Sequence, residues 1–174
     1  MDNLKKLASQ IKLIGFDVDG VLTNGEIIYT DKGDELKIFS AKDGHGMFSL
    51  SKEGFITAII TARSSSIVDK RAKDLDITHV YQGSKNKLLA MQELMAMYNL
   101  DFSQIAYVGD DIPDICILEK AGLSCCPADA VGNVKRICAF VSTKQGGKGA
   151  VREICDFIIA CKKENKEILE VKSL

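Results

Sequence analysis

The sequence predicts an α/β fold with a doubly wound, mainly parallel sheet that carries a β-hairpin insertion in place of a cap domain. Apolar strand-like segments alternate with segments of helical apolar spacing, and acidic residues directly follow two of the strand-like segments. Strands separated by helices imply right-handed crossovers and parallel pairing. The length of 174 residues is enough to bury a core, so we expect one domain over residues 1–174.

The expected elements alternate along most of the chain. Six segments rich in β-branched and aromatic residues are typical of strands, at residues 11–16, 55–60, 78–81, 104–108, 122–125 and 139–141. Helical spacing of apolar residues occurs at 67–75, 87–98, 112–120 and 151–162. No repeat or low-complexity linker divides them.

One segment breaks this alternation. Residues 26–30 and 34–39 are strand-like and flank a glycine-containing turn, which predicts a β-hairpin over about residues 25–40. A lone two-stranded hairpin is only marginally stable in water, so its apolar residues need a partner surface. That surface is either another subunit or the edge of the protomer's own sheet.

Composition excludes several classes of partner. With 23 basic and 24 acidic residues the net charge is −1, which gives no global attraction to nucleic acid or to an anionic membrane. The N-terminus has no apolar run of signal-peptide length, and no later run is long enough to span a membrane. We therefore expect a cytoplasmic protein.

The cysteines and histidines give weak signals. None of the cysteines forms a Cys-x-x-Cys pair, so we expect small apolar core residues at Cys116, Cys125, Cys126, Cys138, Cys155 and Cys161. His79 begins a strand-like segment and is expected to pack there. His45 lies between two glycines, within reach of a site, but has no partner histidine.

The first acidic pair, Asp17 and Asp19, follows the strand-like run at 11–16. Side chains two residues apart in an extended segment point to the same side, so the two carboxylates can converge. The carboxyl edge of the sheet is the usual ligand crevice of doubly wound folds. Two close carboxylates repel unless a cation separates them, and oxygen ligands favour Mg²⁺. Taken alone, the segment is equally typical of a solvated turn.

Other strand ends and helix starts carry residues suited to phosphate. A hydroxyl and a guanidinium donate to phosphate oxygens, a lysine at a helix N-terminus adds positive charge, and a second acidic cluster follows another strand. These residues are Thr61 and Arg63 after 55–60, Lys87 at the start of 87–98, and Asp110, Asp111 and Asp114 after 104–108. The usual residue preferences of turns do not explain this combination of residues at separate strand ends. It therefore indicates phosphate chemistry.

In this order, the acidic pair, threonine, lysine and second acidic cluster resemble the four motifs of the haloacid dehalogenase superfamily. The resemblance covers nearly the whole chain. The hairpin in place of a cap, the segment 39–46 and the segment 146–153 are similar to the capless 3-deoxy-D-manno-octulosonate (Kdo) 8-phosphate phosphatase family, whose members act in lipopolysaccharide sugar synthesis. The resemblance implies a Mg²⁺-dependent phosphatase and a homotetramer.

The resemblance also implies roles for the catalytic residues. Asp17 would attack phosphorus and form an aspartyl-phosphate. Asp19 would protonate the leaving sugar oxygen and then activate water. The groups implied to hold Mg²⁺ are Asp17, the main-chain carbonyl of Asp19 and Asp110, supported by Asp111 and Asp114, while Thr61 and Lys87 would hold the phosphoryl oxygens.

The implied contacts with the sugar-acid phosphate are less complete. They fall on Asp19, Ser40, Ala41, Lys42, Asp43, Gly44, Arg63, Arg71 and Lys87. A basic contact of the family is replaced here by Phe48, which cannot pair with a sugar carboxylate. Phosphatases of nine-carbon ulosonic acid 9-phosphates are therefore the alternative, although they usually carry an acidic residue at the position of Arg63.

Three further functions are less consistent with the sequence: a phosphoacceptor receiver module, an inactive scaffold and a phosphomutase. A phosphoacceptor receiver module also combines acids, a threonine and a lysine, but it places its acceptor aspartate on a later strand. An inactive scaffold would be expected to have lost Asp17 or Asp19, and both are present. A phosphomutase would need a cap to exclude water, and this length leaves no room for one. Because no cap domain shields the site, we expect the hairpin of a neighbouring subunit to close it.

Overall fold

The computed structural model describes residues 2–172, and the side chains of residues 3–165. Within these residues the main sheet has six strands, all parallel, in the order β5-β4-β1-β6-β7-β8. The strands are β1 (Leu13–Phe16), β4 (Ile56–Ile60), β5 (His79–Tyr81), β6 (Ile105–Val108), β7 (Leu123–Cys126) and β8 (Phe140–Val141). The predicted doubly wound parallel fold is confirmed.

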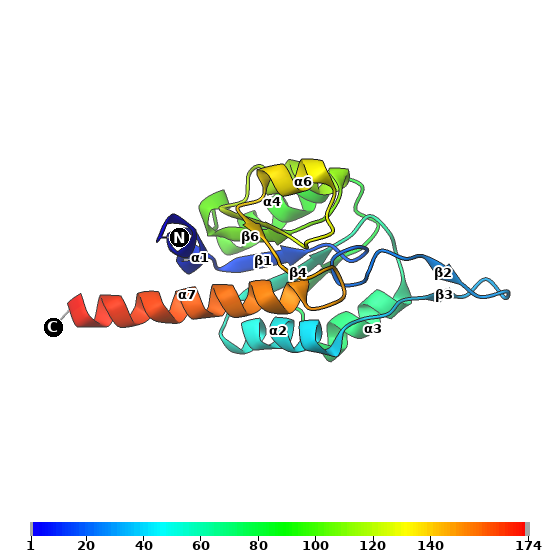
Figure 1. Ribbon diagram of the computed structural model, residues 1–174, viewed down its shortest axis with the longest axis horizontal. Coiled ribbons are helices and arrows are strands. Elements are labelled where there is room, and N and C mark those ends of the chain that lie inside the picture. The colour runs from blue at the N-terminus through cyan, green and yellow to red at the C-terminus, as the bar shows by residue number, and fades with distance from the viewer. Residues whose placement is uncertain (1, 173–174) are drawn as a thin grey trace.

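Helices cover both faces of the sheet because the buried strands are apolar on both sides (Figure 1). One face packs Ile14 and Phe16 against α1 (Asp2–Gln10), α2 (Ala41–Lys52), α3 (Ser66–Asp74) and α7 (Ala150–Lys172). The other face packs Leu13 and Tyr107 against α4 (Lys87–Tyr98), α5 (Ile115–Leu118) and α6 (Gly132–Ile137). The short 3-10 helices η1 (Phe102–Gln104) and η2 (Ile112–Asp114) precede β6 and α5.

The topology places a crevice at the end of β1. Strand β1 pairs with β4 on one side and with β6 on the other, and the chain reaches these neighbours by crossovers in opposite directions. This reversal is the topological switch point, where ligands bind in open α/β sheets. The loops that follow β1, β4 and β6 therefore meet at one edge.

The predicted hairpin is present as β2 (Ile28–Tyr29) and β3 (Glu35–Leu36), which form a separate two-stranded sheet. It projects beyond the body of the molecule, on the side opposite both chain ends (Figure 1). Ile28 pairs with Leu36 and Tyr29 with Glu35, so the latter two share one face of the hairpin. The hairpin thus does not extend the main sheet, which excludes the sheet-edge alternative within the protomer.

Three helices lack a counterpart in the predicted set, namely α1, α2 and α6. The sequence pattern does not predict α2, because the segment contains two glycines and glycine has low helical propensity. Close packing against α7 favours glycine at one of these positions, because a Cβ on Gly46 would lie 3.1 Å from the Cα of Arg152. The expected helix at 112–120 is divided into η2 and α5, and the one expected at 151–162 continues to Lys172.

The cysteines and His79 differ in how far they match the expectations from the sequence. The prediction that all cysteines lie in apolar surroundings was wrong for Cys116, which is exposed on α5, while Cys138 is only half buried. His79 packs as expected, against the ring of Tyr98. Among the described helices, none combines the length and the apolarity that crossing a membrane requires.

Candidate active site

A cleft of about 330 Å³ opens at the switch point. Its residues come from the loops after β1, β4 and β6 and from the start of α4. They are Asp17, Asp19, Gly25, Thr61, Ala62, Arg63, Lys87, Asp110, Asp111, Pro113 and Asp114. The structure therefore brings together the acidic pair, the threonine, the lysine and the second acidic cluster, as the strand-end argument predicts.

Lys87 connects the two acidic clusters at the floor of the cleft. Its Nζ lies 2.8 Å from Oδ2 of Asp17 and 2.7 Å from Oδ1 of Asp114, and its side chain is only 4 % exposed. Burial opposes a charge on Lys87, but the two carboxylates outweigh it and raise the lysine pKa. The ammonium group therefore remains charged at the site where a phosphate oxygen would lie.

Asp114 organises the loop after β6. Its Oδ1 accepts hydrogen bonds from Lys87 and from the hydroxyl of Tyr107, at 2.7 and 3.0 Å. Its Oδ2 accepts from the backbone amides of Asp110 and Asp111, at 3.0 and 3.3 Å. Both oxygens are thus occupied, so Asp114 supports the site and does not offer a free metal ligand.

Asp17, Asp110 and Asp114 place carboxylate oxygens within 4.8 Å of one another. Oδ1 of Asp110 is buried and has no hydrogen-bond partner among the described residues. A Cβ on Gly20 would lie 2.0 Å from Oδ2 of Asp110, so the loop can approach this carboxylate only with glycine there. A buried, unpaired carboxylate oxygen beside another carboxylate fits a hard cation such as Mg²⁺.

The acid pKa values report the same crowding. Burial, followed by the charge of Asp114, raises the pKa of Asp17 to about 6 although Lys87 opposes the shift. Burial and the charges of Asp17 and Asp114 raise the pKa of Asp110 to about 8. Without a cation, both carboxyl groups are therefore harder to ionise, Asp110 more so than Asp17.

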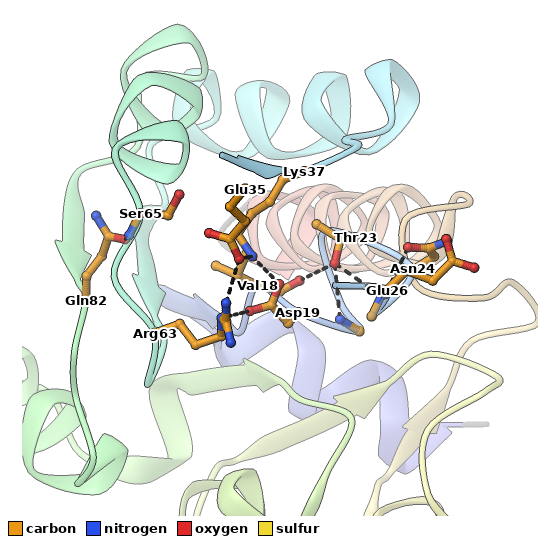
Figure 2. A network of polar contacts seen from close by, with 12 residues as sticks. Val18, Asp19, Thr23, Asn24, Glu26, Glu35, Lys37, Arg63, Ser65 and Gln82 are labelled. Atoms are coloured by element: carbon orange, nitrogen blue, oxygen red, sulfur yellow. Dashed lines mark hydrogen bonds and ion pairs between the residues drawn. The ribbon is translucent and has the colours of Figure 1, made fainter. Parts of the chain in front are cut away.

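Asp19 lies at the mouth of the cleft in a charged network that includes the hairpin (Figure 2). Nζ of Lys37 is 2.5 Å from Oδ1 of Asp19, and Nε of Arg63 is 3.6 Å from Oδ2. Glu35 lies between the two cations, 2.7 Å from Nη2 of Arg63 and 3.4 Å from Nζ of Lys37. Arg63 also donates to the hydroxyl of Tyr29 at 3.2 Å.

Thr61 follows β4, and its side chain is buried at the cleft wall. Its amide donates to the carbonyl of Tyr81 at 2.9 Å, and its carbonyl accepts from the amide of Ser84 at 3.0 Å. These bonds tie the loop after β4 to the loop after β5 and so position the hydroxyl in the cleft.

The remaining predicted sugar contacts lie apart from the cleft. Ser40, Asp43, Gly44 and Arg71 line a small, nearly filled pocket between α2 and α3, where Arg71 donates to the carbonyl of Ser40 at 3.1 Å. A Cβ on Gly44 would lie 2.2 Å from Nη2 of Arg71, so a larger residue there would displace the end of the arginine side chain.

Asp43 has a structural contact that the sequence did not indicate. Its carboxylate accepts hydrogen bonds from the amides of Gly149 and Arg152 at 3.0 and 2.8 Å, and so caps the N-terminus of α7. Ala41 and Lys42 are exposed at the start of α2, as is His45. Phe48 is 37 % exposed, with the ammonium group of Lys52 4.8 Å from its ring centroid.

Sequence reasoning missed the polar face of the hairpin and the hydroxyl of Tyr107. Tyr29, Glu35 and Lys37 all contact the Asp19–Arg63 pair, yet the hairpin was interpreted through its apolar residues alone. The alternation of Glu35 and Lys37 with Leu36 and Ile38 was the available signal, because alternate residues of a strand face opposite sides.

Comparisons with known proteins agree with this geometry. Residues 76–154 match the family model of haloacid dehalogenase-like hydrolases. The chain is 40% identical over 158 residues to the 3-deoxy-D-manno-octulosonate 8-phosphate phosphatase of Yersinia pestis, covering 91% of this chain and 84% of that protein. It is 41% identical to the corresponding Escherichia coli K12 protein, covering 87% of this chain and 81% of the relative.

Solved structures agree in fold as well. The Yersinia pestis phosphatase superposes with a TM-score of 0.91 at 40% identity, covering 93% of this chain and 88% of that one. The Moraxella catarrhalis phosphatase, in complex with magnesium, phosphate and KDO, superposes with a TM-score of 0.92 at 38% identity, covering 98% of both chains. The chain therefore belongs to the 3-deoxy-D-manno-octulosonate 8-phosphate phosphatase family of haloacid dehalogenase-like hydrolases.

Proposed function

We propose that this chain is a Mg²⁺-dependent phosphatase that hydrolyses Kdo 8-phosphate to Kdo and inorganic phosphate, within lipopolysaccharide sugar biosynthesis. The observation that carries the proposal is the Asp17–Lys87–Asp114 arrangement beside the unpaired Asp110, in a chain 40% identical to named phosphatases of this substrate. Nucleophile, cation site and phosphate-binding lysine are thus adjacent.

In the first step, an oxygen of Asp17 attacks phosphorus and the bond from phosphorus to the sugar oxygen breaks, which forms an aspartyl-phosphate. Lys87 and Thr61 hold the phosphoryl oxygens, since both line the cleft floor beside Asp17. Asp19, at the mouth of the cleft, transfers a proton to the departing sugar oxygen, and the product is a free hydroxyl.

In the second step, water attacks the phosphorus of the aspartyl-phosphate. Asp19, now ionised, takes the proton of this water, and the bond from phosphorus to the Asp17 oxygen breaks. Inorganic phosphate leaves and both carboxyl groups return to their starting state. Dividing hydrolysis between two displacements lets one carboxylate serve as acid and then as base.

Asp17, the main-chain carbonyl of Asp19 and Asp110 would hold Mg²⁺, with Asp111 and Asp114 supporting them. When bound, this cation neutralises the negative charges that otherwise keep a carboxylate nucleophile and a phosphate dianion apart. Burial and the neighbouring carboxylates raise the pKa values of Asp17 and Asp110, and the same neutralisation opposes both causes.

For the sugar end, we propose recognition of a carboxylate by Arg63, which lines the same cleft as Asp17. Ser40, Ala41, Lys42, Asp43, Gly44 and Arg71 are the further contacts that the family pattern implies, and they lie beyond this cleft. The alternative substrate is a nine-carbon ulosonic acid 9-phosphate. Arg63 favours the eight-carbon acid, whereas Phe48 removes one basic contact.

The decisive experiment compares kcat/KM for Kdo 8-phosphate, a nine-carbon ulosonic acid 9-phosphate and a neutral hexose phosphate, each with Mg²⁺ and with excess chelator. We expect the eight-carbon acid to be preferred by at least about tenfold, equivalent to roughly 1.4 kcal/mol of transition-state binding. A preference for the nine-carbon acid would reassign the substrate, and full turnover in chelator would contradict the mechanism.

A further inference from the structure

The hairpin brings a buried lysine to Asp19, and nothing in the proposed reaction accounts for it. The Lys37 side chain is 3 % exposed, and its Nζ contacts Oδ1 of Asp19 at 2.5 Å and Oε1 of Glu35 at 3.4 Å. Removing an ammonium group from water is costly unless it is paired. The two carboxylates supply this pairing, which fixes the position of the lysine.

The contacts leave the two oxygens of Asp19 in different surroundings. Oδ1 accepts the short hydrogen bond from Lys37, whereas the contact of Oδ2 with a described residue is the longer one with Nε of Arg63, at 3.6 Å. In Figure 2, Lys37 reaches Asp19 from the hairpin and Arg63 reaches it from the loop after β4, while Glu35 contacts these two cations. The carboxyl group is thus held by one oxygen while the other remains available to the cleft.

We propose that Lys37 is a positioning residue that orients the carboxyl group of Asp19, so that Oδ2 faces the leaving oxygen of the substrate. This inference rests on the proposed function only in taking Asp19 as the proton donor and acceptor. Because Asp19 acts twice, one oxygen has to stay in place through both steps, and an ammonium donor can hold it throughout.

Glu35 fixes the lysine from the opposite side. Burial disfavours its charge, but the hydrogen bond from Arg63 and the charge of Lys37 lower the pKa of Glu35, so it remains ionised. Its bond to Arg63 and the contact of Tyr29 with Arg63 attach the hairpin to the loop after β4. The hairpin is therefore attached to the site in two ways. Lys37 binds Asp19, and Glu35 and Tyr29 bind Arg63.

The test measures kcat/KM over a series of phosphate monoesters that runs from nitrophenyl to simple alkyl esters, in the presence of Mg²⁺. These esters lack the sugar, so the result does not depend on which sugar acid is the physiological substrate. General acid catalysis matters most for poor leaving groups, and it contributes about 10²–10⁴-fold where it operates.

We expect Lys37→Met to lower kcat/KM for the alkyl esters by at least about tenfold more than for the nitrophenyl ester, in the same direction as Asp19→Asn. Lys32→Met is the matched control, because Lys32 is exposed at the turn of the same hairpin. In the Lys32→Met variant, kcat/KM should depend on the leaving group as it does in the wild type. In the double variant Asp19→Asn/Lys37→Met, the loss should match that of Asp19→Asn alone.

Glu35→Gln separates orientation from attachment of the hairpin. It weakens the bond to Arg63, whereas the amide oxygen of glutamine can still accept from Lys37 and the shorter contact with Asp19 keeps the lysine in place. It should retain the wild-type dependence on the leaving group. The inference is overturned if Lys37→Met lowers kcat/KM equally for all esters of the series. It is also overturned if Glu35→Gln shows the same dependence of kcat/KM on the leaving group as Lys37→Met, or if Lys37→Met lowers kcat/KM by its full factor in the Asp19→Asn background. If the wild type hydrolyses the series but not Kdo 8-phosphate, the proposed substrate fails and the role of Lys37 is still decided.

Discussion

At the scale of single residues, Asp17 and Asp114 share one lysine but have different environments. Asp114 is fully buried and accepts four hydrogen bonds, whereas Asp17 retains 8 % exposure and lines the cleft. A carboxylate saturated with donors is a poor nucleophile, because its lone pairs are engaged. The difference in environment supports the proposal that Asp17 is the nucleophile and Asp114 a supporting residue.

Replacing Asp17 by Asn should abolish turnover, with a loss of at least about 10³-fold in kcat, because the amide cannot form the aspartyl-phosphate. The fold should persist, since the substitution is nearly isosteric and also relieves repulsion between carboxylates. Steady-state kinetics and a thermal melt measure the two effects. Substantial activity in a variant of confirmed mass would contradict the assignment.

The acid cluster predicts a link between pH, Mg²⁺ and stability. Asp110 has a pKa of about 8 in the folded protein and an ordinary value of 3.8 when unfolded. Between these values the folded state holds the extra proton, so the metal-free protein should lose stability as pH rises from about 4 to 8. Above the folded-state pKa of Asp110, a further rise in pH causes no further loss of stability through this group.

Mg²⁺ should therefore stabilise the protein more at pH 8 than at pH 6, because it displaces fewer protons there. Thermal melts at both pH values, with and without Mg²⁺, measure this. Asp110→Asn is the control: it should raise the melting temperature of the metal-free protein at pH 8 and remove most of the Mg²⁺ response. An equal Mg²⁺ response at both pH values would count against the predicted link.

At the scale of elements, the glycine-rich loop before α7 supports the loop after β1. The amide of Gly147 donates to the carbonyl of Val21 at 3.0 Å, and a Cβ on Gly146 would lie 1.9 Å from the carbonyl oxygen of Gly20. The amide of Gly146 is held by Oδ1 of Asp129 at 2.9 Å, so this loop cannot easily retreat. Two backbones therefore meet directly behind the catalytic acids.

Gly146→Ala should displace the loop that carries Asp17 and Asp19, and lower kcat by more than about tenfold, because small misplacements of reacting groups are costly. Gly132→Ala is the matched control, since a Cβ there would have its nearest neighbour at 3.6 Å, on the flexible side chain of Arg136. It should leave kcat within about twofold and gain slight helix stability. Equal kinetics for the two variants would exclude the supporting role of Gly146.

At the scale of the whole molecule, the hairpin has two faces with different tasks. Tyr29 and Glu35 face Arg63, and Lys37 reaches Asp19 from the same strand pair. Leu36 and Ile38 are 49 % and 66 % exposed. We propose that these apolar residues, with Ile28, contact another copy of the chain in a homotetramer, because a small hairpin with an exposed apolar face is marginal alone.

Ile28→Asp combined with Ile38→Asp should dissociate this assembly, because each new carboxylate would be buried at the interface. Sedimentation velocity measures the change of mass. We expect kcat/KM to fall more for Kdo 8-phosphate than for nitrophenyl phosphate, since a subunit that closes the cleft contacts the larger ester. A monomeric wild type with full activity on the sugar phosphate would refute the proposal.

By itself, the sequence determined the parallel sheet, the helices α3, α4 and α7, and the edge at which the acids, Thr61 and Lys87 meet. Local patterns suffice for these features: apolar runs mark buried strands, and parallel strands bring all of their carboxyl ends to one edge. Residues that directly follow a strand therefore share a cleft whatever the course of the intervening loops. The same logic placed Asp110, Asp111 and Asp114 together.

Only the tertiary structure decided which side chains contact one another across separate elements. Asp43 caps a helix that starts more than 100 residues later, and the exposure of Cys116 depends on how α5 lies on the body. Lys37, which follows the second strand of the hairpin, contacts Asp19 in the loop after β1. No periodicity encodes such contacts, since they depend on loop paths and on the packing of whole elements. The contact between Lys37 and Asp19, on which the proposed orienting role rests, thus belongs to the fold as a whole.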